Sequence, residues 1–416
     1  MMNSLVKILI WTVGLATVFA FYAHKILALP SAITTPISAA IIAIGLISTA
    51  ILGIPILQSM PAVTNERKLS VILMCLSIFL CVISTIAGLV NREMNLTDWG
   101  AFGVQVGTPF LLFMCPNRSL LMKSIGIYCV GFSLLDFGAN VLDYFGVATF
   151  ARHVGTQGSS GYGVHYLGVS DSSFAEGMVA FIACSFLSID LPNAEIREKI
   201  FRISLIVILL FSLNMIHART YLFMTIIAVP LLGIRQFWRI PPVFTMGFMI
   251  VASMYATFFD PGRDSEEVMR GWLVQDGWDA VGNHLFLGTG ATYRDSSNIV
   301  ARYQSLRGAG VTESGILDFA ISYGVPAATL LVISALLAAS GKKIFQTWPA
   351  VLLIVLTGSL AFAGSLSSFL GSILFWCSLI YCQRDEGVIM MQVMDQDHGK
   401  GLQPDRQITP SLEGVG

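Results

Sequence analysis

Arginines stand at several positions where a phosphate or diphosphate could be bound, because the planar guanidinium donates two parallel hydrogen bonds to anionic oxygens. Arg219 is the most informative, since it lies in a short polar link between two long apolar runs. If those runs cross a membrane, the link holds Arg219 at the membrane surface. There it could bind a lipid phosphate or simply anchor the helix by reaching toward the headgroups.

Three further arginines belong to two longer polar segments of the chain: Arg152, Arg263 and Arg270. The sequence 264–281 around Arg270, with its two tryptophans, predicts a helix. Arg270 could supply a second cation for the same anion, and the alternative is an ordinary surface arginine. Clustered cations of this kind could also contact anionic lipid headgroups.

Acids and a histidine supply candidate groups for proton transfer and substrate contact. Glu313 precedes an apolar segment, where it could deprotonate a hydroxyl or act only as a negative charge at a helix N-terminus. Asp318 lies inside that segment, and ionisable residues in such segments normally face a cavity or a partner. His284 is either a substrate contact or a loop residue that forms hydrogen bonds.

A second set of polar residues shares one helical face. Asp136, Asn140 and Asp143 follow the spacing i, i+4, i+7 at the end of an apolar segment. Because these side chains would be costly against lipid, we expect them to line a wet outer cavity, with Asp136 contacting substrate.

The elements that must position these residues are apolar helices. The 416 residues are 55% hydrophobic and only 12% charged, and the apolar runs approach the roughly 20 residues that cross a bilayer. The composition predicts an all-α integral membrane protein with about twelve transmembrane helices and excludes a water-soluble enzyme. The formal net charge of −1 argues against a nucleic-acid partner. The P-loop, zinc-protease and hydrolase-elbow motifs do not occur, and no Cys/His metal spacing is present.

The distribution of Lys and Arg between the loops predicts that both termini are cytoplasmic, since 15 of the 24 cations then fall inside. No internal repeat is evident, and the two halves of the sequence show no matching pair of broken helices. The predicted organisation is helices 1–5 in 1–142, a first outer loop in 143–173, helices 6–9 in 174–258, a long, partly helical periplasmic loop in 259–314, helices 10–12 in 315–383, and a disordered cytoplasmic tail in 384–416.

Three stretches, taken in order, resemble the Wzy-type O-antigen and exopolysaccharide polymerases and their O-antigen ligase relatives. His217–Thr220 is similar to the Ser-Arg hairpin of that family, with alanine in place of serine. Arg270–Trp272 followed by Asn283–Gly290 is similar to its loop pattern, which ends in Gly-x-Gly. Glu313–Asp318 followed by Tyr323–Pro326 is similar to its re-entry into the membrane.

The resemblance implies a membrane glycosyltransferase that uses polyprenyl-diphosphate-linked oligosaccharides at the periplasmic face of a bacterial inner membrane. Arg219 and Arg270 would bind the diphosphate, and Glu313 would act as the base. The expected substrate-binding residues are Arg152, Arg263, His284, Asp136 and Asp318. The diphosphate already activates the donor, so the resemblance implies no nucleotide, redox cofactor or metal. Its expected partners are the lipid bilayer and the chain-length regulator and flippase proteins of a polysaccharide pathway.

Two alternatives remain open. An O-antigen ligase would use the same chemistry with a different acceptor, but this chain has Thr312-Glu313 where ligases usually have a His-Asn pair. A transporter or flippase of lipid-linked sugars would be favoured by inverted repeats and by discontinuous helices.

Overall fold

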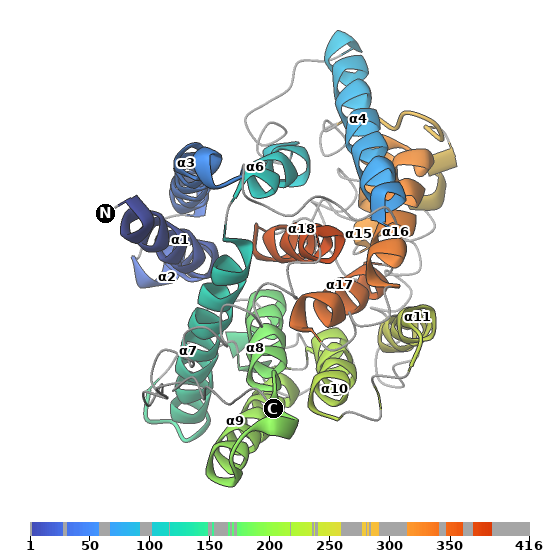
Figure 1. Cartoon of the computed structure of the whole chain (residues 1–416). Coiled ribbons are helices and arrows are strands. Elements are labelled where there is room, and N and C mark those ends of the chain that lie inside the picture. Colours follow the sequence, from blue (N-terminus) through green and yellow to red (C-terminus); the bar gives the residue numbers. More distant parts are fainter. Residues whose placement is uncertain are drawn as a thin grey trace, which may run out of the picture.

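The fold is a bundle of α-helices in which the only sheet among the described residues is one antiparallel pair of two-residue strands (Figure 1). The computed structural model describes residues 2–27, 31–57, 67–91, 102–115, 117–148, 152–153, 165–166, 169, 173–216, 218–234, 237, 240–258, 277–279, 281–282, 284–290, 314–340, 347–360 and 369–384. Its helices are α1 (Met2–Phe19), α2 (Ala23–Ile26), α3 (Ser31–Leu57), α4 (Lys68–Asn91), a π-helical turn (Gly103–Gly107), α6 (Thr108–Met114), α7 (Arg118–Tyr144), α8 (Ser173–Leu187), a 3₁₀ turn (Leu191–Asn193), α9 (Ile196–Met215), α10 (Arg219–Gly233), α11 (Pro242–Phe258), α15 (Gly315–Tyr323), α16 (Val325–Ala339), α17 (Trp348–Ser359) and α18 (Phe369–Arg384); the strands are β1 (Arg152–His153) and β2 (His165–Tyr166).

The all-helical membrane class predicted from composition agrees with this architecture. Within the described residues, three helical segments are long and apolar enough to cross a bilayer: Lys68–Val90, Arg118–Tyr144 and Phe174–Asn193. Seven shorter apolar helices of 10–17 residues accompany them. Large apolar side chains on the outside of the bundle, among them Ile44, Phe79 and Phe248, are exposed as expected for a surface in contact with lipid.

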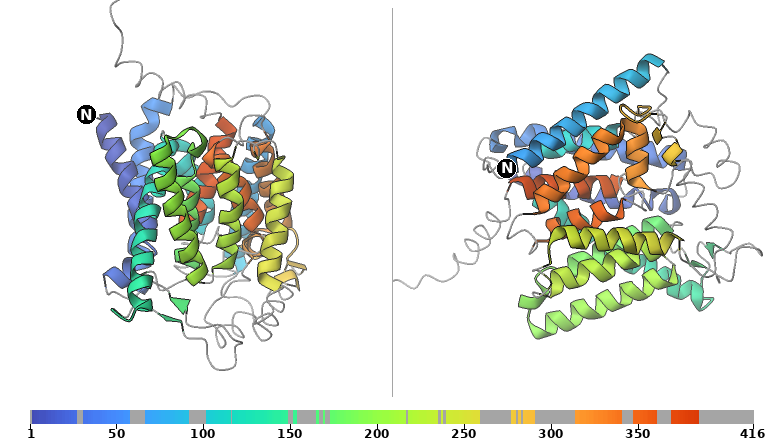
Figure 2. Two further views of the ribbon diagram at one scale, coloured as in Figure 1. Left: turned by 90° about the horizontal axis from the view of Figure 1, so that it is seen from below. Right: turned by 90° about the vertical axis from the view of Figure 1, so that its right-hand side faces the viewer.

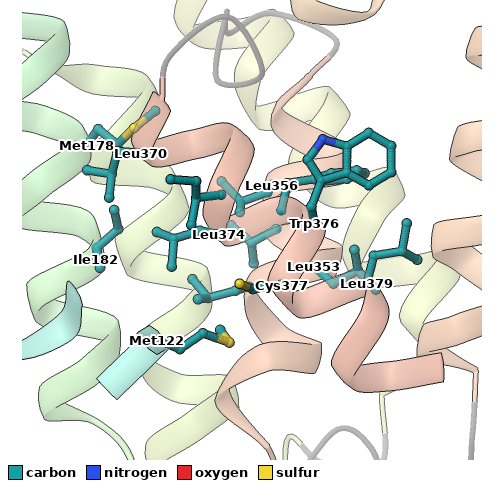
Figure 3. Packing of buried hydrophobic residues seen from close by; sticks show 14 of the residues in the cluster. Met122, Met178, Ile182, Leu353, Leu356, Leu370, Leu374, Trp376, Cys377 and Leu379 are labelled. Carbon is teal, nitrogen blue, oxygen red and sulfur yellow. The ribbon is translucent and has the colours of Figure 1, made fainter. Parts of the chain in front are cut away.

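The centre of the bundle is formed by α17 and α18 (Figures 1 and 3). Every residue of α17 is buried, and so is α18 from Leu370 to Gln383. Figure 3 shows Leu356 of α17 near Leu374 of α18 and Leu353 nearer Leu379, with Met178 of α8 at the edge of the cluster. A 12-residue helix rises only about 18 Å, well short of a ~30 Å hydrocarbon core, so α17 is stabilised by neighbouring helices rather than by spanning alone.

Helix α4 packs along α16 through a row of serines spaced seven residues apart. The Ser70 hydroxyl donates to the carbonyl of Ser334 at 2.8 Å, and the Ser77 hydroxyl donates to the carbonyl of Ala327 at 2.7 Å. The Ser334 hydroxyl donates back to the carbonyl of Ser70 at 2.8 Å. The two helices therefore run antiparallel, and small polar residues let their backbones approach closely.

The apolar segment Gly315–Ala339, where the first of the predicted helices 10–12 begins, is not one continuous helix, because the structure breaks it at Gly324 into α15 and α16. Gly324 has φ 89° and ψ 156°, a conformation open essentially only to glycine. The amide of Val325 donates to the carbonyl of Leu285 at 2.9 Å, and the amide of Thr289 donates to the carbonyl of Ile321 at 2.8 Å. The segment 284–290 thus supplies backbone partners that the interrupted helix lacks. The described residues thus contain one discontinuous helix that the apolar pattern did not reveal.

The third serine of the α4 row completes this arrangement. Pro326 has no amide hydrogen, so it cannot bond the carbonyl of Ser322 four residues earlier as a continuous helix would. The Ser84 hydroxyl donates to that carbonyl at 2.8 Å and also to the carbonyl of Leu287. Ser84 therefore connects α4, α15 and the 284–290 segment.

Replacing Ser84 with alanine is expected to lower the free energy of unfolding by about 1–2 kcal/mol, because it removes the donor to two partly buried carbonyls. Thermal unfolding of the purified protein in detergent measures the effect. Ser188→Ala is the matched control, since among the described residues the buried Ser188 hydroxyl bonds only the Cys184 carbonyl one turn earlier. Equal loss in both variants would contradict a special role for Ser84.

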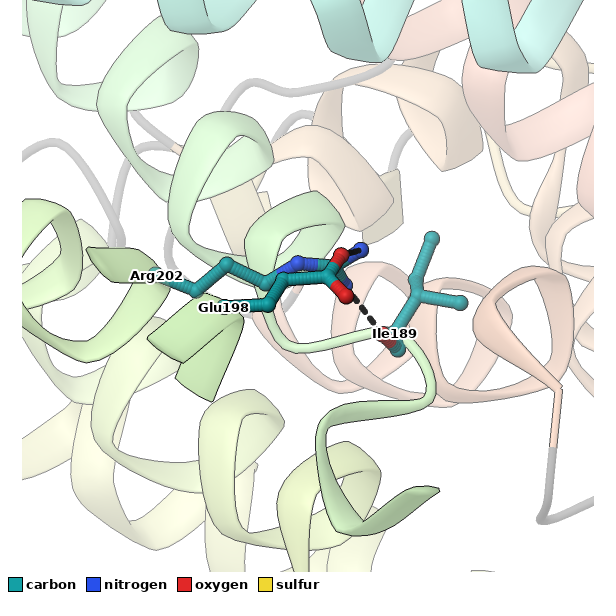
Figure 4. A network of polar contacts seen from close by, with 3 residues as sticks. All are labelled: Ile189, Glu198 and Arg202. Carbon is teal, nitrogen blue, oxygen red and sulfur yellow. Dashed lines mark hydrogen bonds and ion pairs between the residues drawn. The ribbon is translucent and has the colours of Figure 1, made fainter. Parts of the chain in front are cut away.

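Two arginines donate hydrogen bonds to main-chain carbonyls at the end of the bundle where α7 and α9 begin. Arg118 is fully buried, and its Nη1 donates to the carbonyls of Leu112 at 2.9 Å, Phe113 at 3.1 Å and Cys115 at 2.9 Å, which end α6. Arg202 pairs with Glu198 one turn earlier and donates to the carbonyl of Ile189 at 2.7 Å (Figure 4). Both contacts fix turns between helices at this end.

The opposite end of the bundle, where α7 ends and α8 begins, is here called the Asp136 end. Figure 2 shows β1 and β2 at that end and the N-terminus at the other. Helices α1, α7 and α9 finish at the Asp136 end, whereas α8 and α10 start there. This alternation brings five helix ends together.

Candidate functional site

One face of α7 carries four buried polar side chains at the Asp136 end. Ser133, Asp136, Asn140 and Asp143 repeat with helical spacing, and each is at most 2% exposed. The sequence placed three of them on one face, and that prediction is confirmed. The expectation that this face lines a wet cavity is wrong, because the side chains are packed against protein.

Asp136 connects three separate parts of the chain. The hydroxyl of Tyr22, which follows α1, donates to its Oδ2 at 2.6 Å. The amide of Val169, near the end of the first predicted outer loop, donates to its Oδ1 at 2.9 Å. Each carboxylate oxygen therefore accepts a hydrogen bond, and Asp136 is 0% exposed. In this structure it orders the surrounding elements, and its predicted contact with substrate remains a prediction.

Glu176, in the first turn of α8, is the residue that sequence reasoning missed. It is 1% exposed, and its Oε1 accepts hydrogen bonds from Asn140 Nδ2 at 2.7 Å and from Ser212 Oγ at 3.1 Å. These bonds join α8 to α7 and α9. The signal available in the sequence was a lone acid in the first turn of an apolar helix, an uncommon place for a charge within the membrane.

Helix α10 begins directly beside this polar cluster. A Cβ atom added to Gly177 would lie 2.5 Å from Tyr221 Cδ2 and 2.8 Å from Ala218 Cβ, so only glycine permits the observed approach of α8 to α10. The rings of Phe174 and Tyr221 meet edge to face, with centroids 5.6 Å apart. Arg219 is the first residue of α10, so its backbone lies at the Asp136 end; its side chain lies outside the described set.

The N-terminus of α10 differs from that of α15. Ala218 precedes α10 and provides no side-chain cap, whereas Ser314 caps α15 by accepting from the Leu317 amide at 3.3 Å. The first-turn amides of α10 are therefore left without a side-chain acceptor among the described residues. Amides of this kind, with the positive end of the helix dipole, favour binding of anions.

The other predicted site residues fall into two groups. His284 is exposed in the turn packed at the α15–α16 break, and Asp318 lies in the first turn of α15, 8% exposed. The structure thus associates these two with the broken helix and associates Asp136 and Arg219 with the Asp136 end. Arg152 lies in β1, and its side chain is outside the described set. Arg263, Arg270 and Glu313 lie outside the described residues, as do most of both predicted outer loops and the 385–416 part of the tail; of the predicted helix 264–281, residues 277–279 and 281 are described and helical.

Chemically, the Asp136 end combines buried carboxyl groups with an uncapped helix N-terminus that begins with arginine. Among the described residues, no group of three or more His, Cys, Asp or Glu side chains could hold a metal ion. No family model matches the chain, and no curated protein matches its sequence.

Proposed function

We propose that this protein is a polysaccharide polymerase of the Wzy type, a membrane glycosyltransferase that joins polyprenyl-diphosphate-linked oligosaccharide repeat units. The proposal includes about twelve membrane spans, both termini in the cytoplasm, and a site facing the periplasm of a bacterial inner membrane. The observation that carries it is Arg219 as the first residue of an uncapped helix, beside a buried polar cluster. The ordered resemblance around Arg219, Arg270 and Glu313 supports the same reaction.

In this reaction the bond between the donor sugar and the lipid diphosphate breaks, and a hydroxyl of the next lipid-linked repeat forms the new glycosidic bond. Arg219, with Arg270 and the first-turn amides of α10, would stabilise the negative charge that develops on the leaving diphosphate. Glu313 would accept the proton of the attacking hydroxyl. Arg152, Arg263, His284 and Asp318 would bind the oligosaccharides. Chain-length regulator and flippase proteins would work beside it in the membrane.

The size distribution of glycan in cells that lack this protein tests the proposal. Single repeat units that reach the outside but are never joined are the expected result. Long chains left on the lipid carrier would instead indicate a ligase, and repeats retained in the cytoplasm would indicate a transporter. Either of these results would contradict the polymerase proposal.

A transporter of lipid-linked sugars is the second candidate, and the break at Gly324 is the observation that favours it. Transporters often bind substrate where helices are discontinuous, because the interrupted backbone there offers free polar groups. In this protein, however, the segment 284–290 and Ser84 already bond the interrupted backbone. Because the backbone groups at the break already have hydrogen-bond partners within the protein, we prefer the polymerase proposal.

A further inference from the structure

Glu176 and Asn140 leave a matched pair of oxygens without partners. Both donors that reach Glu176, Asn140 Nδ2 and Ser212 Oγ, bond the same oxygen, Oε1. Glu176 Oε2 and Asn140 Oδ1 are buried and have no hydrogen-bond partner in the described part of the chain. The two orphaned atoms therefore belong to two side chains that are already bonded to each other through their other atoms.

Two acceptors cannot bond each other, so an ionised Glu176 would leave both oxygens unsatisfied. A proton on Oε2 changes this, because a carboxylic acid and a primary amide are complementary. The amide N–H donates to one acid oxygen, and the acid O–H donates to the amide oxygen. An unpartnered anionic oxygen is among the costliest groups to bury, whereas the neutral pair buries no charge.

The surroundings of Glu176 favour the same protonation state. Asp136 lies one turn before Asn140 on the same face of α7, and each of its oxygens accepts a hydrogen bond, one from Tyr22 and one from the Val169 amide. The described polar side chains that bond Glu176 are Asn140 on α7 and Ser212 on α9. In the described part of the chain, Glu176 forms no ion pair with a cation. Two neighbouring buried carboxyl groups are most stable when one is charged and the other is neutral.

We propose that Glu176 is a positioning residue that carries a proton, pairs as a neutral acid with the Asn140 amide, and so fixes α7, α8 and α9 behind the start of α10. Because it is neutral, it holds these helices without competing with a diphosphate for Arg219. A carboxylate at this place would attract the arginine and repel the phosphates. This consequence for Arg219 rests on the proposed function, but the protonated pair does not.

Infrared spectroscopy of the full-length protein in detergent tests the proton directly. A protonated carboxyl group has a carbonyl stretch distinct from that of a carboxylate, and this stretch shifts in heavy water. We expect a band of this kind at neutral pH in the wild-type protein and its loss in Glu176→Gln. If the two spectra do not differ in this band, the inference is overturned, whatever the enzyme activity of the protein.

A set of variants tests the pairing. Glu176→Gln keeps a neutral side chain of the same shape. The thermal unfolding temperature is therefore expected to stay at the wild-type value, and the polymerisation rate is expected to stay within about twofold of wild type. Glu176→Ala is expected to lower the thermal unfolding temperature. It is also expected to reduce the polymerisation rate by about tenfold or more, because α10 and Arg219 at its start lose their alignment. Asn140→Asp alone is expected to be impaired, and the double variant N140D/E176Q, which exchanges acid and amide, is expected to recover.

These readouts separate the two proposals. If Arg219→Ala has no effect on polymer but the infrared band and the double-variant rescue are found, the proposed function fails while the neutral pair stands. If Glu176→Gln is as damaging as Glu176→Ala, or the double variant does not recover, the neutral pair is wrong even if polymerisation is confirmed.

Discussion

Replacing Arg219 with alanine is expected to abolish polymer while the protein still accumulates in the membrane. In the proposed reaction the guanidinium stabilises charge on the departing diphosphate, and losing one such donor typically costs about 100- to 1,000-fold in rate. Gel analysis of glycan chain length, with the membrane level of the protein measured in parallel, tests this. Wild-type chain lengths in the variant would remove the central claim.

Two further arginine variants make the result specific. Arg202→Ala removes a guanidinium that pairs with the exposed carboxylate of Glu198 one turn away and donates to the Ile189 carbonyl, and we expect normal polymer and a change in unfolding free energy of about 1 kcal/mol. Arg219→Lys keeps the positive charge but loses the planar pair of donors, so intermediate activity is expected. Full activity of the lysine variant would mean that charge alone is required.

Replacing Gly324 with alanine is expected to destabilise the protein by at least about 3 kcal/mol. One contribution is backbone strain of about 1–3 kcal/mol, since φ is 89° where side chains other than hydrogen are disfavoured. The other is a clash, because the new Cβ would lie 2.1 Å from the Phe286 carbonyl oxygen. Thermal unfolding in detergent measures the loss of stability. Protease sensitivity of the 284–290 segment measures whether the clash with Phe286 displaces that segment.

Two glycine controls separate these contributions. Gly146 also has a positive φ, 71°, but a Cβ there meets nothing within 4 Å, so Gly146→Ala should show strain without a clash. Gly138 lies within α7 with open space around it, so Gly138→Ala should be neutral or slightly stabilising. Equal stability of the Gly324 and Gly146 variants would show that the contact with Phe286 contributes nothing.

The class of fold follows from composition alone. A chain with so few charges and such long apolar runs can satisfy its backbone in a membrane only through helices, because every amide must find its partner within the segment. Helical spacing also determined that Asp136, Asn140 and Asp143 share a face. The apolar pattern could not show the break at Gly324, since the residues on both sides of it are almost all apolar, with Asp318 the one Asp, Glu, Lys, Arg or His residue of α15 and α16.

Only the tertiary structure decided what that shared face contacts. Tyr22 and Asp136 are 114 residues apart, and Asn140 and Glu176 are 36 residues apart, so no local spacing predicts either hydrogen bond. Burial of Asp136 likewise depends on α8 and on Val169 packing over α7. Periodicity and hydropathy are local properties of the sequence. They therefore determined that the protein is apolar and helical, and which polar residues share one face of a helix. Which polar groups meet, and which become buried, was decided by long-range packing.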